Sequence, residues 1–272
     1  MQSKTTYSRR YRKNISICYL GISAIKTYKT FSKLLKLNIN HLVSIMGAGG
    51  KATLMKRLIL EAQESDSPIL VTGTTNLHSF KNSTGLQTIS GYEGIKVSQK
   101  DEKILWAKKK LPNDIFHGFS TREIDGIQEK VKKYLIIVKT DGARKRLIKV
   151  PNSTEPLIPK KTTHCVAIFN MQSIGQKASS ELIHRFELCS QIAKLKKNNI
   201  IEYSHLANLI SYKDGYLSRM PKESKKILYL SGCIKKDDLK NAEKICKSIE
   251  KIGYDMLIFG DTIEKKFFLY GE

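Results

Sequence analysis

Residues 42–54, LVSIMGAGGKATL, join a short apolar run to a glycine-rich turn and the start of a helical pattern. The run over residues 42–46 predicts a buried strand, and the apolar spacing over residues 52–64 predicts a helix. Glycines in such a turn let backbone N–H groups approach phosphate oxygens, and the helix N-terminus adds partial positive charge. Lys51 adds a full positive charge, so the stretch predicts a strand–turn–helix unit that can hold phosphate.

The glycine turn departs from the full phosphate-binding motif, G-x-x-x-x-G-K-[ST]. With Gly50 and Lys51 as the fixed pair, Ile45 stands at the first glycine, and Ala52 replaces the hydroxyl that normally holds Mg²⁺. Two interpretations stay open: a loop that binds phosphate, and a glycine turn that binds no nucleotide. The candidate nucleotide-binding residues of the turn are Gly47, Ala48, Gly49, Gly50, Lys51, Ala52 and Thr53.

Apolar runs alternate with amphipathic segments along the rest of the chain. We expect strands at residues 68–72, 134–138, 165–169, 226–230 and 256–259, and helices at 30–38, 121–133, 179–196, 204–211 and 238–252. Residues 77–120 predict a loop-rich insertion with small strands or helices. This alternation predicts an α/β fold whose mainly parallel sheet is covered by helices on both faces.

Polar residues follow the expected strands, and ligands bind beyond the carboxyl ends of strands in such sheets. The glycine turn, Thr74 with Thr75, and Asp141 with Arg144 should therefore line one crevice. Asp141 is the candidate catalytic and Mg²⁺-binding residue, although Asp-Gly is also a common turn.

Several basic residues follow Asp141 in the segment from Arg144 to Lys149. These residues could bind phosphates or form a solvated rim. We favour the rim for most of them and Arg144 as the one candidate phosphate ligand. The His184-Arg185 pair has two open interpretations, a catalytic histidine and a packed or capping one.

The composition of the 272-residue chain is strongly basic, with 48 Lys and Arg against 25 Asp and Glu and a net charge of +23. The excess indicates either a generally lysine-rich composition or attraction to phosphate-bearing partners. Scattered lysines without interleaved aromatics disfavour nucleic acid as that partner. No apolar run has the length of a membrane span. Five widely spaced cysteines favour reduced thiols and a cytoplasmic protein.

The chain divides near residue 30. Residues 1–30 are first basic and then apolar, which favours a poorly ordered extension and leaves a cleaved signal peptide as the alternative. Residues 31–272 have the length and pattern of one α/β domain.

The chain resembles the YqeC family in four segments that occur in the same order: VSIMGAGGKATLMKRL, ILVTGTTNL, DGARKRLIKVPNSTEPLIP and HRFEL. The resemblance covers roughly residues 31–260 and includes the E-P-x-I-P element at residues 155–159. The family is described as selenium-dependent molybdenum hydroxylase accessory proteins, or selenium cofactor biosynthesis proteins. It resembles P-loop nucleotide-binding proteins, so a P-loop NTPase-like fold is implied for residues 31–272.

The resemblance also carries site residues over by position. It places Gly47, Gly49, Gly50 and Lys51 in a phosphate loop, Thr74 and Thr75 at a threonine-rich strand end, Asp141, Gly142 and Ala143 in an E-x-D-G-A element, and His184, Arg185 and Glu187 in an H-R-P-E-L element. Four positions depart from the family: Ala52 replaces a hydroxyl residue, Asn76 a basic residue, Lys139 a glutamate and Phe186 a proline.

The resemblance implies a protein that binds ATP or GTP, with Mg²⁺ as a candidate cofactor, and assists maturation of a selenium-dependent molybdenum hydroxylase. The implied partners are the nucleotide and that hydroxylase or its cofactor-maturation proteins. Slow hydrolysis of the nucleotide is the enzymatic activity left open. Because the departures fall on polar positions, the Mg-nucleotide site would be weakened. The alternative is a non-catalytic module on a degenerate P-loop fold, which binds an anion or cofactor or docks to a partner.

Overall fold

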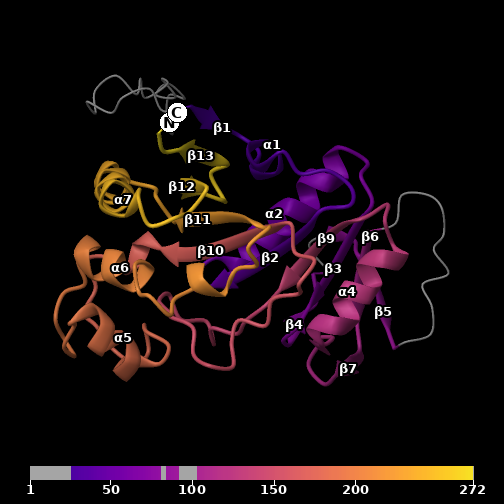
Figure 1. Cartoon of the computed structure of the whole chain (residues 1–272), viewed down its shortest axis with the longest axis horizontal. Coiled ribbons are helices and arrows are strands. Elements are labelled where there is room, and N and C mark those ends of the chain that lie inside the picture. The colour runs from indigo at the N-terminus through magenta and orange to yellow at the C-terminus, as the bar shows by residue number, and fades with distance from the viewer. Residues whose placement is uncertain (1–25, 81–83, 92–102, 272) are drawn as a thin grey trace, which may run out of the picture.

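The computed structural model describes residues 26–80, 84–91 and 103–271, and a ten-stranded sheet forms the centre of this part (Figure 1). The strands lie in the order β1-β13-β12-β11-β10-β2-β9-β3-β6-β5. They are β1 (Thr27–Tyr28), β2 (Leu42–Gly47), β3 (Ile69–Gly73), β5 (Gln87–Ser90), β6 (Lys103–Ala107), β9 (Leu135–Lys139), β10 (His164–Asn170), β11 (Lys225–Ser231), β12 (Met256–Asp261) and β13 (Lys266–Leu269). Every neighbouring pair from β12 to β5 is parallel, and only the pairs that involve β13 are antiparallel. The predicted mainly parallel sheet is confirmed.

Helices cover both faces of this sheet, as predicted. They are α1 (Phe31–Leu35), α2 (Lys51–Glu64), α4 (Thr121–Lys130), α5 (Phe186–Ala193), α6 (Tyr203–Ile210) and α7 (Lys236–Ile249), with single 3₁₀ turns at Met171–Ser173 and Leu217–Arg219. The side chains of β2 point alternately to the helices on the two faces of the sheet. Val43 and Ile45 pack with α1 and α2, whereas Leu42 packs with α4 and Met46 with α5, α6 and α7 on the opposite face (Figure 1).

The helices follow from local sequence. The apolar positions of α2, Leu54, Leu58, Ile59 and Ala62, are buried, as their spacing predicted. Helix α4 begins with a capping box, because the Glu123 amide donates to Ser120 Oγ over 3.3 Å and the Ser120 amide donates to the Glu123 carboxylate over 2.6 Å.

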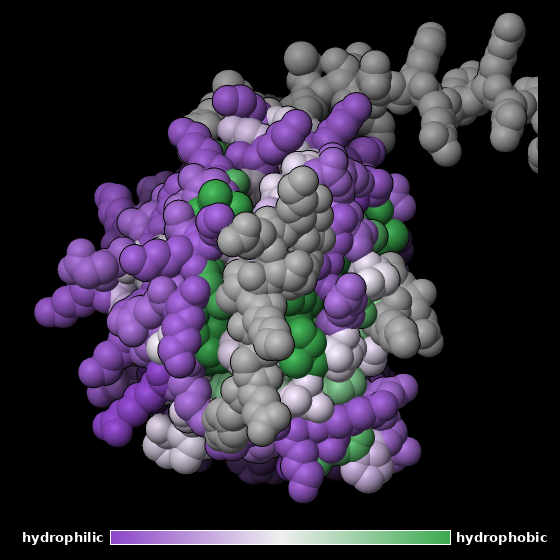
Figure 2. Space-filling model, turned by 90° about the vertical axis from the view of Figure 1, so that its right-hand side faces the viewer, coloured by the Kyte–Doolittle hydropathy of each residue, from purple (hydrophilic) through white to green (hydrophobic). Residues whose placement is uncertain are grey.

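The insertion at residues 77–120 contains short strands, as predicted, and two of them join the main sheet. Its strands β5 and β6 extend the main sheet beyond β3, and β4 (Leu77–His78), β8 (Ile115–His117) and β7 (Lys109–Leu111) form a small antiparallel sheet. The described residues on the side of the molecule where β5 and α4 lie present a mainly hydrophilic surface, and hydrophobic residues are visible near the centre of this side (Figure 2).

The helix predicted at residues 179–196 is wrong in its first third. Residues 179–185 contain turns and one bridge residue, and helix α5 begins only at Phe186. Two features of the backbone explain the late start of the helix. Ile183 forms a parallel bridge with Ile148, and Arg185 has a left-handed backbone with φ +58°. Neither conformation fits a right-handed helix.

The fold already includes part of the predicted N-terminal extension, because β1 pairs with β13 through Thr27 and Tyr28. The rest of that extension, residues 1–25, lies outside the described residues. Among the residues that are described, no helix combines the length and the hydropathy needed to cross a membrane.

Strand order brings three distant segments together. Strand β9 lies between β2 and β3 and pairs in parallel with both, and β10 pairs with the other edge of β2. The chain therefore leaves β2 toward β3 and later returns to the opposite side of β2. The carboxyl ends of β2, β3 and β9 share one edge, where the sequence predicted a crevice.

Candidate functional site

The glycine turn lies tightly against the ends of β10 and β11. Gly47 and Gly49 have φ values of +101° and +66°, and a Cβ on either would collide with β10, with the Ile168 backbone at Gly47 and with the Asn170 side chain at Gly49. The Gly49 carbonyl accepts from Asn170 Nδ2 over 2.5 Å and from Ser231 Oγ over 2.9 Å. The turn thus requires glycine and has a fixed position.

Part of the turn keeps its amides unpaired. Among the described residues, no acceptor bonds the backbone N–H groups of Gly49, Gly50 and Lys51, and both glycines are partly exposed. Gly50 is the N-cap of the 14-residue helix α2 and provides no side-chain cap. Unpaired amides at a helix N-terminus form a site that favours an anion.

Lys51 turns inward from the first turn of α2. Its Nζ lies 2.9 Å from Asp141 Oδ1 and donates to the Gly47 carbonyl, and the residue is 7% exposed. Burial lowers the pKa of Lys51, and the Asp141 charge opposes that shift. The predicted convergence of this ammonium group with the carboxylate is therefore present in the geometry.

Asp141 follows β9, is fully buried and faces four donors. Oδ1 contacts only Lys51 among the described residues, as an ion pair without hydrogen-bond geometry. Oδ2 lies 2.9 Å from Lys149 Nζ and accepts from Tyr216 Oη over 3.0 Å and from the Gly47 amide over 3.2 Å. Burial would raise the pKa of Asp141, but Lys51 and Lys149 hold it below its usual value.

Lys149 is not on a solvated rim, and this prediction is wrong. The residue is 1% exposed, because its Nζ bridges Asp141 and Glu155 Oε2, which lies 2.7 Å away. Arg185 binds the same Glu155 oxygen over 2.9 Å. Burial favours a higher pKa for Glu155, but hydrogen bonds from Lys149 and Arg185 lower it overall. Buried lysines need such counter-charges.

Hydrogen bonds hold the loop at residues 151–163 to the residues that follow β3 and β9. The Leu157 amide donates to the Thr140 carbonyl over 3.0 Å, and the Leu157 carbonyl accepts from Thr74 Oγ1 over 2.8 Å. The predicted strand-end residue Thr74 therefore fixes the loop that supplies Glu155. Thr75 Oγ1 is buried and has no hydrogen-bond partner in the described part of the chain.

Lys139 is a further cation at this edge. It ends β9, opposite Ile45 of β2 and Gly73 of β3, and its Nζ donates to the Asn76 carbonyl. Burial, together with the nearby charge of Lys51, lowers the pKa of Lys139 to about 8, although the Asp141 charge opposes this shift.

A comparison with family models identifies residues 43–187, more than half of the chain, as YqeC protein. The chain belongs to the YqeC family. The uncharacterized protein YqeC of Escherichia coli (strain K12) is 22% identical over 226 residues, which cover 82% of this chain and 88% of that protein. No solved structure matches the chain.

Some predicted residues of this YqeC-family site lie apart from the cluster. Arg144 is exposed, has a left-handed backbone with φ +47° and forms no ion pair within the described residues. Ala52 and Thr53 are exposed on the first turn of α2. His184 also stays outside the ion pairs, and burial together with the Arg185 charge lowers its pKa to about 4, so it is neutral near pH 7.

The side chains around Asp141 do not fit Mg²⁺, the cofactor that the predicted nucleotide site implies. The position after Lys51 is Ala52, which has no oxygen ligand. Lys51, Lys149 and Tyr216 surround the Asp141 carboxylate. No group of three or more metal-ligating side chains is found where the structure is described. Binding of Mg²⁺ by Asp141 stays a prediction that would require these contacts to change.

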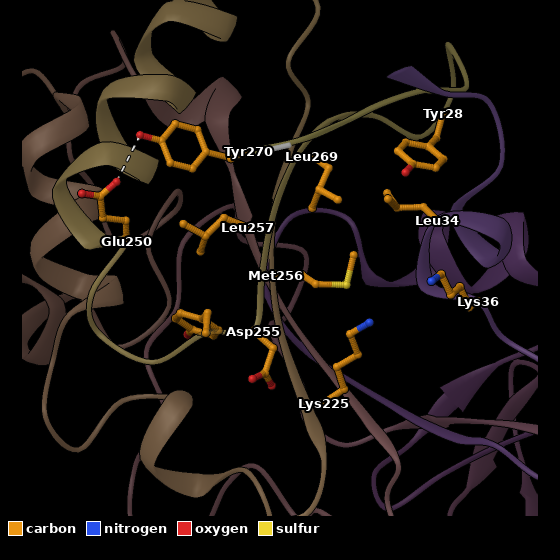
Figure 3. Close-up of a pocket in the computed structure, with 12 residues that line it drawn as sticks. Tyr28, Leu34, Lys36, Lys225, Glu250, Asp255, Met256, Leu257, Leu269 and Tyr270 are labelled. Atoms are coloured by element: carbon orange, nitrogen blue, oxygen red, sulfur yellow. Dashed lines mark hydrogen bonds between the residues drawn. The ribbon is translucent and has the colours of Figure 1, made fainter. Parts of the chain in front are cut away.

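A cavity of about 480 Å³ lies at the opposite edge of the sheet (Figure 3). Its lining includes Lys225 and Met256, which begin β11 and β12, together with Tyr28, Asp255 and Tyr270. The strands run from this cavity toward the glycine turn, so the cavity is separate from the charged cluster and contains none of the predicted site residues.

Proposed function

We propose that this YqeC-family protein binds a nucleoside triphosphate, ATP or GTP, at the glycine turn of a P-loop-like fold. The observation that carries the proposal is the group of unpaired amides at Gly49, Gly50 and Lys51, in the same turn whose Gly47 carbonyl accepts from the buried Lys51 ammonium. Phosphate oxygens would accept from these amides and draw the ammonium away from Asp141. Oδ1 can release Lys51 because Lys149 and Tyr216 continue to hold Oδ2.

The wider role that we propose is assistance in the maturation of a selenium-dependent molybdenum hydroxylase in the cytoplasm. Family membership and the resemblance of the four segments support it. The protein would act together with that hydroxylase or its cofactor-maturation proteins. Slow hydrolysis of the bound nucleotide, with Asp141 as the acidic group of the site, belongs to the same proposal.

Calorimetric titration of the full chain with ATP and GTP, each with Mg²⁺ and with EDTA, tests binding. The Lys51→Met variant removes the ammonium and keeps most of the side-chain volume, and Lys56→Met on the same helix is the control. We expect binding in at least one condition, with a loss of about tenfold or more in Lys51→Met and little change in the control. Absence of binding in all four titrations would refute the proposal.

The second candidate function is a non-catalytic module that binds another anion or a cofactor, or docks to a partner. The closed ion pair between Lys51 and Asp141 favours it, because a closed pair needs no nucleotide for its stability. Titration with a phosphorylated pterin and with selenite separates the candidates. Binding of either anion without any binding of ATP or GTP would support the module, whereas nucleotide binding alone would support the first proposal.

A further inference from the structure

We infer that the site binds its polyphosphate without a divalent metal, and that the Lys139 ammonium supplies positive charge that a metal would otherwise bring. This inference rests on the proposed nucleotide function and specifies the form of the ligand. It is carried by the charges around Asp141 and by the position of Lys139. It is also carried by the missing hydroxyl at Ala52, by the lysine pairs of Asp141 and by the unpaired amides of the glycine turn.

The strand ends hold more positive than negative charge. Ion pairs connect Lys51, Lys149 and Arg185 through the two carboxylates of Asp141 and Glu155. Lys139 is close enough to interact electrostatically with Lys51, Lys149 and both of these acids. Four cations and two carboxylates leave two positive charges, which is the formal charge of one Mg²⁺.

The position of Lys139 allows its ammonium group to bind a phosphate oxygen of the ligand. Its strand, β9, lies between the strand that leads to the glycine turn and the strand that leads to Thr74 and Thr75. Its Nζ contacts a backbone carbonyl, that of Asn76, and no carboxylate lies within ion-pair distance among the described residues. The charge of Lys139 is therefore not neutralised by direct pairing, and a phosphate oxygen can replace the carbonyl at a gain in charge complementarity.

Donor groups at the same edge point to an anion rather than to a cation. The amides of Gly49, Gly50 and Lys51 and the buried hydroxyl of Thr75 have no partners among the described residues. Backbone N–H groups donate hydrogen bonds to anions, and an N–H group has no lone pair with which to ligate Mg²⁺. An Mg²⁺ ion near Asp141 would meet Lys51, Lys139 and Lys149 as repulsive neighbours, and it would lack the hydroxyl that Ala52 replaces.

Calorimetric titration with ATP and with inorganic triphosphate tests the inference, in EDTA and in excess Mg²⁺ at matched ionic strength. The Lys139→Met variant removes the charge and retains the chain length. The matched control is Lys133→Met, because Lys133 is an exposed lysine just before the same strand, at the opposite edge of the sheet. Thermal unfolding of each variant verifies that it remains folded.

The expected result is binding in EDTA at least as tight as binding in Mg²⁺. Lys139→Met should weaken binding in EDTA by about tenfold, and Lys133→Met should change it by less than about twofold. Binding that requires Mg²⁺ would overturn this inference and leave the nucleotide proposal intact. Absence of binding in both conditions would overturn the nucleotide proposal itself. Equal affinities of the Lys139→Met and wild-type proteins would refute the inference that Lys139 binds the polyphosphate.

Discussion

The Nζ atom of Lys149 lies 2.9 Å from Oδ2 of Asp141, and neither side chain is accessible to solvent. The other oxygen of Asp141 contacts Lys51, so one buried carboxylate pairs with two ammonium groups that come from different parts of the chain. Tyr216 adds a hydrogen bond from a third segment. Asp141 therefore connects the glycine turn to Lys149 and Tyr216, and its removal should affect stability as well as binding.

Replacement of Asp141 by asparagine should lower the free energy of unfolding by about 3 kcal/mol, since it leaves two buried ammonium groups short of a counter-charge. For a domain of this size that loss corresponds to roughly 10 °C in melting temperature. The matched control is Asp114→Asn, because the Asp114 side chain is 72% exposed in its pair with Lys110 and such pairs contribute little. Calorimetric melting of both variants measures the difference, and equal melting temperatures would contradict a structural role for Asp141.

Acid should destabilise the protein through the same cluster. The pKa values of Asp141 and Glu155 are lowered in the folded state from usual values of 3.8 and 4.5. Because the unfolded chain binds protons first, stability from these groups is complete above the usual values and is lost as pH falls through them toward the folded-state values. Urea unfolding from pH 7 to pH 3 should show this loss. The Asp141→Asn protein should show a shallower acid slope, and an unchanged slope would assign acid unfolding to other groups.

The Tyr216→Phe variant should lose about 1.5–3 kcal/mol of stability, because a hydroxyl that donates to a buried carboxylate disappears. Tyr270→Phe is the control, since the Tyr270 hydroxyl makes only a 3.4 Å contact with Glu250 at an exposed position. A double-mutant cycle with Asp141→Asn measures whether the effect runs through Asp141. Additive losses in that cycle would show that Tyr216 stabilises the core independently of the carboxylate.

Much of the fold was predictable because local sequence and strand periodicity agree. The apolar run at residues 42–46 and the helical spacing at 52–64 became β2 and α2 within one residue. The meeting of Lys51 and Asp141 was also predictable, because both follow parallel strands and such ends share one edge of a sheet. The helix at residues 179–196 was predicted too long, since a long-range bridge between Ile183 and Ile148 overrides local apolar spacing.

The contacts of Lys149 and Tyr216 with Asp141 were not predictable in the same way. Lys149 lies in a basic run that resembles a solvated rim, and its burial depends on Glu155 and Asp141 arriving from other segments. Its immediate neighbours Ile148 and Val150 are apolar, which was the one local signal for burial. Tyr216 lies 75 residues after Asp141 in sequence, and nothing near it indicates a site.

The Gly49→Ala variant should be strongly destabilised and should lose anion binding. Gly49 has a left-handed backbone, and an added Cβ would collide with Asn170 and come within 3.0 Å of the Leu147 carbonyl. Gly126→Ala is the matched control, because Gly126 lies inside α4 with nothing within 4 Å of a Cβ, and alanine there should stabilise the helix by about 0.5–1 kcal/mol. Melting curves and the ATP titration measure both effects, and a Gly49→Ala protein with normal melting would contradict the required conformation.

Metal-free binding should depend on pH through Lys139. Its folded-state pKa of about 8 means that it is charged near pH 7 and largely neutral at pH 9, so affinity for a polyphosphate should fall about fivefold to tenfold across that interval. The bound anion opposes loss of the proton and moves the fall to higher pH. Triphosphate esters complete their own ionisation below this range, since the last pKa of a phosphate group is about 6.

The groups that face Lys139 must be considered in the same measurement. They are Lys51 from α2, Asp141, Lys149 and Glu155 from the segment after β9, and the Asn76 carbonyl after β3. Lys51 also has a lowered pKa and is the second group whose titration can weaken binding. The Lys139→Arg variant separates the two, because arginine keeps its charge throughout this range. Titrations in EDTA between pH 7 and pH 9 should show the fall in the wild-type protein and a much smaller one in Lys139→Arg, whereas equal falls in both proteins would assign the titration to Lys51.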